Sequence, residues 1–369
     1  MLLGTPTELP DSLQDGAQQA AQACVNLLEA QGPGGRCRVD IDTSVGDETF
    51  TLQKRSTEFM QLLVTYLCYL QMPHLQQQQL DDTMRVVTAK TELTQLELRR
   101  NELVEQLQQS MAQSAASTAE TAETAMIQVN ATKEQLSLLQ QDMDQLQDVI
   151  NRGGRDPNYQ YQGPICRIYF PDEGSAALAR RDWLTPPAKS GGGNAPLVPP
   201  CVEFSSCGGV QLRDISKDQL VFFYCPRASE AKYVEQILQD TELKASEQLQ
   251  LIIFVNPILV DMGVTGFGMA GRLLRERLID PLPYAYYLRT LAWGALTRVW
   301  PRDFSIWQED DNEDGGYRLI RTLSQLPSNP EVEDIYDVTN GLRDSKTTGG
   351  GGGGVWDQLG DFVNGMMRL

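Results

Sequence analysis

The sequence predicts an α/β protein with a mainly parallel sheet flanked by helices, an antiparallel extension, and a long inserted coiled-coil hairpin. Continuous apolar strands such as "LVFFYC" and "LQLIIFV" alternate with helical segments, a pattern typical of a parallel sheet buried on both faces. Short aromatic strands follow them. Between Gln76 and Arg152 the chain contains no glycine, proline, phenylalanine, tyrosine or tryptophan, which predicts uninterrupted helix.

Residues 1–73 form the predicted first part of the α/β domain. Pro10, Asp11 and Ser12 make a helix start, and the apolar positions that follow repeat with helical spacing. The segment "CRVDID" alternates apolar and polar residues with the period of a strand. A second helix, about Leu52 to Gln71, ends before Pro73.

Residues 74–155 form the predicted inserted coiled-coil hairpin. Its second half steps by three and four residues, as a coiled-coil seam requires, at Leu136, Leu139, Met143, Leu146 and Ile150. A single continuous helix would be about 110 Å long at 1.5 Å per residue, and a hairpin about half as long. The middle of the segment lacks large core residues, which favours the hairpin. Because a paired arm often binds partners, four of the seam residues are partner-binding candidates: Leu136, Leu139, Met143 and Leu146.

Residues 156–340 return to the α/β pattern and complete the domain. "ICRIYF" is a strand, and Asp172 is expected to cap the helix after it. The segments "YAYYLR", "ALTRVWP", "FSIWQED" and "YRLIR" are the expected antiparallel extension. Residues 341–354 are a glycine-rich linker and 355–369 an amphipathic helix. Its partner-binding candidates are Trp356, Leu359 and Phe362.

The formal net charge of −18 argues against electrostatic binding to nucleic acid and equally disfavours binding to anionic lipid. No apolar run reaches the roughly 18 residues that a transmembrane span needs. Peripheral association with a membrane is left open, and protein partners are the natural expectation. The amino terminus lacks the features of a signal or transit peptide.

The sequence contains few residue patterns that are typical of an enzyme active site. The seven cysteines form no C-x-x-C pair, so a reducing compartment is expected, with Cys201 and Cys207 either a redox pair or buried apolar residues. His74 is the only histidine, which leaves no Ser-His-Asp set and no histidine-based metal cluster. We therefore expect no catalytic residues, no metal site and no cofactor.

The weak candidates for cofactor binding are Gly266, Gly268, Gly271 and Arg272. The three glycines have the G-x-G-x-x-G spacing of a dinucleotide-binding turn. That turn joins strand to helix directly, whereas the strand here ends near Val255 with Pro257 between. A loop whose glycines allow close backbone packing is therefore the favoured interpretation.

Five segments carry a family resemblance, the most specific being "FPDEGSAALARRDW". The others are "PTELPDSLQDGAQQAAQAC", "LVFFYCPRASEAKYVEQIL", "LIIFVNPILVDMGVTGFGMAGRLLRERL" and "YYLRTLAWGALTRVWPRDFSIWQED". Over roughly residues 5–70 and 164–325 the chain resembles the plastid and cyanobacterial domain of unknown function that includes the low photosystem II accumulation proteins. The same domain is fused to some plastid adenylate kinases, but the kinase part has no counterpart here.

The resemblance implies a chloroplast setting, in the stroma or at the thylakoid, and a role in assembling photosystem II. The implied partners are photosystem II core subunits or the thylakoid insertase, and no catalytic residue is carried over. The long coiled coil interrupts the family pattern. The expected function is therefore a non-enzymatic assembly factor. The alternatives are a phosphate- or nucleotide-binding α/β protein and a stable subunit of a larger photosynthetic complex.

Overall fold

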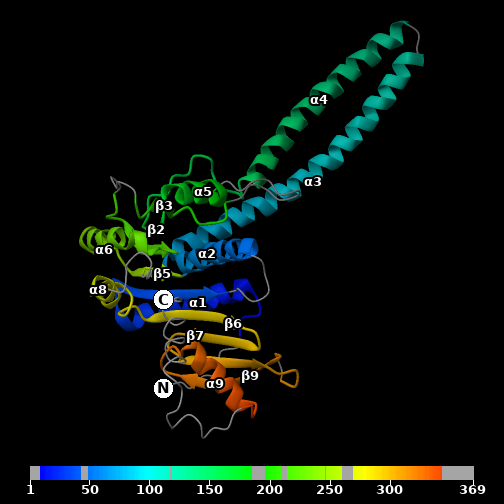
Figure 1. The fold of residues 1–369 in the computed structure, drawn as a ribbon. Coiled ribbons are helices and arrows are strands. Elements are labelled where there is room, and N and C mark those ends of the chain that lie inside the picture. The colour runs from blue at the N-terminus through cyan, green and yellow to red at the C-terminus, as the bar shows by residue number, and fades with distance from the viewer. Residues whose placement is uncertain are drawn as a thin grey trace. The chain divides into compact units, whose positions relative to one another are not determined.

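The computed structural model describes residues 9–42, 49–116, 119–184, 196–208, 214–245, 247–259, 269–313 and 315–342. The chain forms two compact units. The first comprises Met1–Gln71, Gln162–Arg180 and Val198–Leu369, and the second Met72–Tyr161 and Arg181–Leu197. The first unit contains a sheet with its helices, and the second contains a helical hairpin (Figure 1).

The first unit is built on a nine-stranded sheet with the order β3-β2-β4-β5-β1-β6-β7-β8-β9. Neighbours from β3 through β6 are parallel, whereas β6 to β9 form an antiparallel meander. The predicted fold class, a mainly parallel sheet with an antiparallel extension, is therefore confirmed. The strands are β1 (Gly35–Asp42), β2 (Ile165–Phe170), β3 (Val202–Ser206), β4 (Asp218–Tyr224), β5 (Leu251–Val255), β6 (Tyr284–Leu291), β7 (Gly294–Val299), β8 (Phe304–Glu309) and β9 (Tyr317–Leu323).

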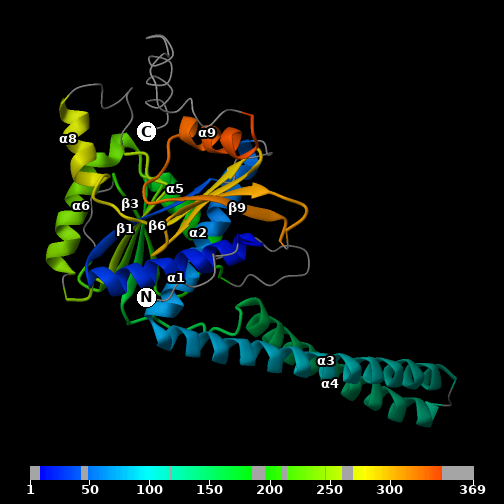
Figure 2. The ribbon, with the colours of Figure 1, turned by 90° about the horizontal axis from the view of Figure 1, so that it is seen from below.

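Helices cover both faces of this sheet. On one face, the Cys24 sulfur of α1 (Leu13–Gln31) lies 4.0 Å from the Cys37 sulfur of β1. On the other, Val234 of α6 shares a core with Phe254 of β5. Figure 2 shows α1 and α9 on opposite sides of the strands. Among the described residues, the helices of this unit are α1 (Leu13–Gln31), α2 (Thr49–Gln71), the first part of α5 (Glu173–Leu184), the 3₁₀ turn η1 (Ala228–Glu230), α6 (Ala231–Lys244), α8 (Met269–Leu278) and α9 (Asn329–Thr339).

The central strands explain why the sequence reads as continuous apolar runs. Every residue from Leu251 to Val255 is at most 1 % exposed. Successive side chains of a strand point to opposite faces, so both faces of β5 are packed. Phe254 stacks on Phe223 of β4 at a centroid distance of 4.8 Å. Each such side chain contributes about 1.5–3 kcal/mol by leaving water.

The second unit is a two-helix hairpin, α3 (Pro73–Ala116) followed by α4 (Ala119–Asn151). The two helices pack against each other. This confirms the predicted hairpin and excludes the single long helix. Among the described helices of the whole chain, none is both long and apolar enough to cross a membrane.

A buried arginine joins three strands of the sheet. Arg167 of β2 is fully buried, and its Nε and Nη2 donate to the Asp218 carboxylate at 2.7 and 2.9 Å. Its Nη1 donates to Glu203 of β3 at 2.7 Å. Burial raises the pKa of Asp218 to about 6, although the hydrogen bonds from Arg167 oppose that rise. The guanidinium therefore holds a carboxylate in a place where water cannot solvate it.

We predict that Arg167→Met destabilises the protein by about 3–5 kcal/mol, because it leaves the buried Asp218 without a counter-charge. Chemical denaturation measures this loss. The matched control is Arg181→Met, whose exposed pair with Asp182 should leave unfolding unchanged. Equal stabilities of the two variants would contradict the role given to Arg167.

The deficit of Arg167→Met should also depend on pH. Without the arginine, the folded-state pKa of Asp218 rises further above its unfolded value of about 4. The stability of such a group is present at low pH and is lost as pH rises through the folded pKa. Denaturation at about pH 5 should therefore show a smaller deficit than at about pH 8. A deficit independent of pH would show that lost packing, not charge, is responsible.

Candidate functional site

The four residues of α4 that the sequence predicted as partner-binding candidates lie in the seam of the hairpin. Leu139 and Met143 are each only 7 % exposed, and Leu136 and Leu146 are half-buried. All four lie on the face of α4 that packs on α3. On α3, Ala89 is 4 % exposed, and Arg100 is half-buried in the same seam. These residues hold the hairpin together.

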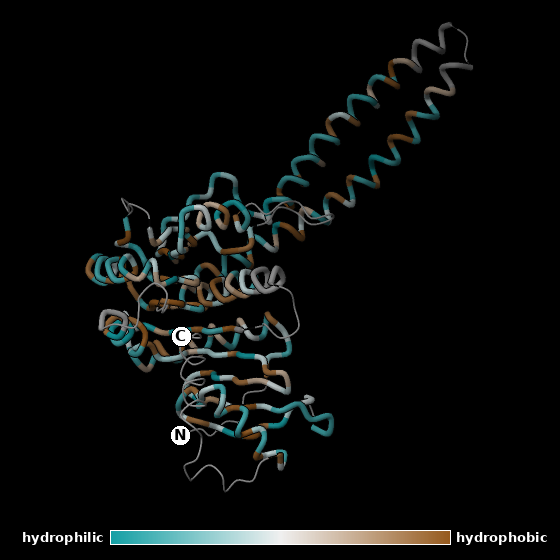
Figure 3. The backbone as a smooth tube through the Cα atoms, viewed as in Figure 1, coloured by the Kyte–Doolittle hydropathy of each residue, from teal (hydrophilic) through white to brown (hydrophobic). Residues whose placement is uncertain are grey.

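Other large apolar side chains of the hairpin remain in solvent. On α4, Ile127 is 65 % exposed and Leu138 is 58 % exposed. They lie about three turns apart on one face, which is roughly 130° around the helix from the middle of the seam. On α3, Leu80 and Leu98 are 56 % and 62 % exposed. In Figure 3, turns of both helices that carry apolar residues alternate with hydrophilic ones. The sequence predicted the seam on α4, whereas these outward residues were not predicted.

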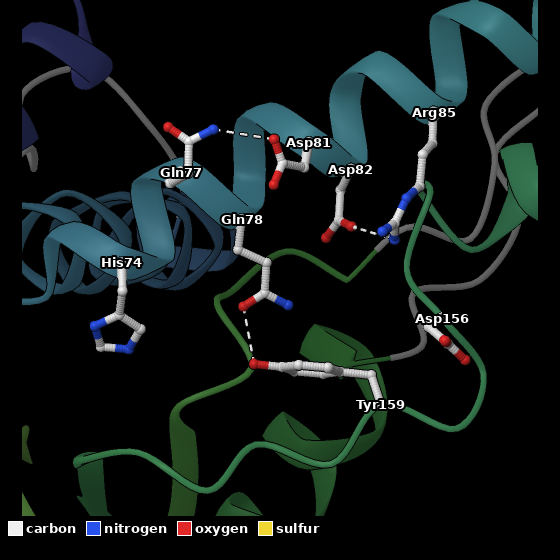
Figure 4. Close-up of a pocket in the computed structure, with 8 residues that line it drawn as sticks. All are labelled: His74, Gln77, Gln78, Asp81, Asp82, Arg85, Asp156 and Tyr159. Atoms are coloured by element: carbon white, nitrogen blue, oxygen red, sulfur yellow. Dashed lines mark hydrogen bonds and ion pairs between the residues drawn. The ribbon is translucent and has the colours of Figure 1, made fainter.

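A polar pocket of about 300 Å³ lies at the base of the hairpin. Figure 4 shows α3 on one side and the segment after α4 on the other. The Tyr159 hydroxyl donates to Gln78 at 2.9 Å, and His74 stacks on Tyr161 with its Nε2 3.1 Å from the Tyr161 hydroxyl. Among the described residues, no group of three potential ligands could hold a metal ion. These contacts hold the segment that follows α4 against α3.

The same base contains a close backbone approach at Gly154. Its φ is +80°, and a Cβ there would lie 2.1 Å from the Asp82 carbonyl oxygen. The Asp82 side chain is 8 % exposed and pairs with Arg85 at 3.3 Å. Burial raises the pKa of Asp82 above its ordinary value, against the attraction of Arg85. Only glycine allows this crossing of α3 by the chain that leaves α4.

We predict that Gly154→Ala loosens the base of the hairpin, because the new methyl group overlaps the α3 backbone. Hydrogen exchange of α3 amides near Asp82 should accelerate by at least about tenfold, which corresponds to about 1.4 kcal/mol of local stability. The matched control is Gly32→Ala, which has a φ of +84° but no atom within 4 Å of the added Cβ. If both variants leave α3 equally protected, the close approach is not needed.

In sheets of this kind, ligands usually bind at the carboxyl ends of the parallel strands. In this protein, the side chains at that edge make hydrogen bonds within the fold. Asp172 caps α5, as expected, by accepting from the Ser175 N–H at 2.8 Å. That bond and the Ser175 hydroxyl lower the pKa of Asp172. Glu173 accepts from the Ser206 hydroxyl at 2.6 Å, and Arg180 donates to the Phe204 carbonyl at 2.7 Å.

Two neighbouring strands end on residues in the left-handed region. Cys225 follows β4 with φ 49°, and Asn256 follows β5 with φ 45°. Asn256 is explained by its amide, which accepts from the Ile41 N–H at 2.8 Å and donates to the Ile41 carbonyl at 3.1 Å. Its side chain thus continues the ladder to β1. Cys225 has no such amide, and its pKa is raised by burial to about 11.

Arg298 of β7 is a cationic side chain of the sheet with one buried nitrogen that has no hydrogen-bond partner among the described residues. Its guanidinium lies 4.7 Å from the Phe304 ring centroid, and the buried nitrogen is Nε. Burial lowers the pKa of Arg298. The neighbouring Arg38 is neutralised by Asp40, with Nε–Oδ1 2.8 Å apart. An unpaired buried donor of this kind could receive an anion.

Of the two alternatives predicted for Cys201 and Cys207, a redox pair or buried apolar residues, the structure favours the second, since both are buried. The Cys201 sulfur lies 3.6 Å from the Cys68 sulfur, so its sulfur neighbour comes from α2. Burial raises the pKa of Cys68 well above its ordinary value and that of Cys207 to about 12. Thiols with raised pKa values are weak nucleophiles at neutral pH.

The remaining candidates fall partly outside the described residues. Gly266 and Gly268, and on the carboxy-terminal segment Trp356, Leu359 and Phe362, lie outside them. Gly271 lies in the first turn of α8, and Arg272 is exposed on that helix. Because β5 ends at Val255 and α8 begins at Met269, the direct strand-turn-helix geometry of a dinucleotide site is not met.

Fold and surface together define an α/β-domain protein that carries an inserted coiled-coil hairpin. A family model described as Domain of unknown function (DUF1995) matches residues 10–334, and the chain belongs to this family. The matched range spans the hairpin as well as the sheet. Neither the curated proteins nor the solved structures include a match to this chain.

Proposed function

We propose that this protein is a non-enzymatic assembly factor that acts through protein–protein contacts and serves photosystem II. One observation carries the proposal: the α/β domain bears a helical hairpin whose apolar residues exceed what its own seam uses. Ile127 and Leu138 are more than half exposed on α4. Apolar side chains aligned on one helix face are a means of binding another protein.

The resemblance to the low photosystem II accumulation proteins supports the setting. On this proposal the protein works in the chloroplast stroma or at the thylakoid surface, by peripheral association. Its partners are photosystem II core subunits or the thylakoid insertase. The raised pKa values of the buried thiols and the structural roles of Asp172 and Arg180 also fit a function without catalysis.

We predict that a tagged form pulls photosystem II core subunits from solubilised thylakoids, and that Ile127→Gln/Leu138→Gln reduces the yield at least about tenfold. Each leucine-sized side chain contributes about 1.5–3 kcal/mol when it is buried. The control is Leu243→Gln on α6, which changes a leucine that is 77 % exposed and should leave the yield unchanged.

If the α4 variant and the control bring down equal amounts, the α/β domain makes the contact. If no form brings down core subunits, the assembly proposal fails. Stoichiometry separates a further alternative. A transient assembly factor is substoichiometric and disappears as assembly is completed, whereas a stable subunit keeps a constant ratio to the complex.

A second candidate function is binding of a phosphate or nucleotide, which the unpaired Nε of Arg298 favours. Ligand at 100 times its Kd should stabilise the fold by about 2.7 kcal/mol. We predict that NAD(P), ATP, AMP and phosphate at millimolar concentration leave the melting temperature unchanged. A shift that Arg298→Gln or Arg272→Gln abolishes would instead establish the binding function.

A further inference from the structure

A row of uncharged side chains follows the outward face of α3. It consists of Leu80, Met84, Val87, Thr91, Thr94 and Leu98, and we call it the α3 row. Its steps are four, three, four, three and four residues, which is the spacing of a coiled-coil seam. Leu80 lies half a turn away from Ala89, which is buried in the hairpin. Helix α3 therefore has two seams, of which the hairpin uses one.

The α3 row is apolar and exposed along its length. Leu80, Met84, Val87 and Leu98 are 56, 61, 55 and 62 % exposed. The two threonines turn their hydroxyls to the helix backbone: Thr91 donates to the Val87 carbonyl and Thr94 to the Lys90 carbonyl, each at 3.0 Å. Their methyl groups are thereby left to face outward, and no charged side chain interrupts the row.

We propose that the α3 row binds the same row of a second copy of this chain, in antiparallel orientation. Antiparallel pairing about a two-fold axis at residue 89 places Leu80 against Leu98 of the second copy. The same register pairs Met84 with Thr94 and Val87 with Thr91. Large residues thus meet at the ends, and smaller β-branched ones lie beside the axis. A two-fold interface needs this self-complementarity.

The flanking charges favour antiparallel over parallel pairing. In the antiparallel register Asp81 lies beside Arg99 of the second copy, and symmetry makes this pair twice. Parallel pairing would instead bring Glu97 toward Glu102 of the second copy. Neither Asp81 nor Arg99 takes part in an ion pair within the described chain, where Asp81 accepts only from the Gln77 amide at 3.0 Å.

On one flank of the α3 row, a like-charge contact weakens the proposed pairing. Lys90 approaches Lys90 of the second copy near the axis, and two like charges weaken such an interface. The interaction is therefore expected to be reversible and of moderate affinity. Removal of this repulsion by Lys90→Gln should tighten the dimer severalfold.

Sedimentation of the purified full chain tests the proposal without any other protein. From about 1 µM to about 1 mM, the wild type should change from monomer to dimer. Leu98→Glu should raise the dimer dissociation constant at least about tenfold, because it places a carboxylate in both end layers. The matched control is Leu138→Glu, the same change at an equally exposed leucine of α4, which should not alter it.

Charge reversal tests the register. Asp81→Arg alone and Arg99→Asp alone should each weaken the dimer, since each creates two like-charge contacts. The double variant should restore it. A chain that stays monomeric at the highest concentration overturns the proposal. So does a dimer insensitive to Leu98→Glu, or a double variant weaker than either single one.

The dimer and the assembly function are tested separately. A monomeric protein that still brings down core subunits would overturn the α3 pairing alone. A dimer that brings down none would leave the pairing intact and remove the proposed function. Circular dichroism of each variant checks that the hairpin remains helical, as expected for substitutions at exposed positions.

Discussion

Burial of the central strands on both faces is the constraint on which the first unit depends. β5 lies between β4 and β1, and its five residues are almost completely excluded from water. Helices must therefore cover both sides, and a charged group that is fully buried there, such as Arg167, is held by carboxylates. Insertion of a long segment between β1 and β2 leaves these strands untouched, because the connection already leaves the sheet there.

The hairpin is constrained differently, because in a pair of helices each helix can bury only the face that contacts the other. Met143 and Leu139 satisfy that constraint inside the seam. Leu98 and Leu138 lie outside it, where no residue of a two-helix arm can cover them. Natural sequences that serve only as spacers keep such positions polar. On the proposed function, the apolar residues on the outer faces are the part of this structure that binds another protein.

Much of the fold could be predicted because periodicity reports burial. The heptad from Leu136 to Leu146 predicted the seam, and the apolar runs predicted β4 and β5. Two elements were not anticipated. The edge strand β3 is short and follows a segment where glycine and proline dominate, and α9 fully buries only one residue, Val332. The N-cap Ser328, which accepts from the Glu331 N–H at 3.4 Å, was a signal for α9.

The candidate site was harder to predict, because pairings across the fold leave no trace in local sequence. In the sequence, Arg167 is one polar residue in an apolar strand, and Gly154 is one of several glycines in predicted turns. Neither position indicates the contact that the residue makes in the fold. The α3 row did leave a trace in its four-three spacing. The sequence placed the α3 side of the hairpin seam at Leu93, Leu96, Leu103 and Leu107, with Arg100 among them, and it gave the outward row no role.

The most direct test of the account is site-specific photocrosslinking in intact chloroplasts. A photoreactive residue in place of Leu138 should form crosslinks to another protein, and one in place of Leu243 on α6 should form few. Crosslinks from Leu243 with none from Leu138 would show that the hairpin is a spacer and that the sheet domain makes the contacts.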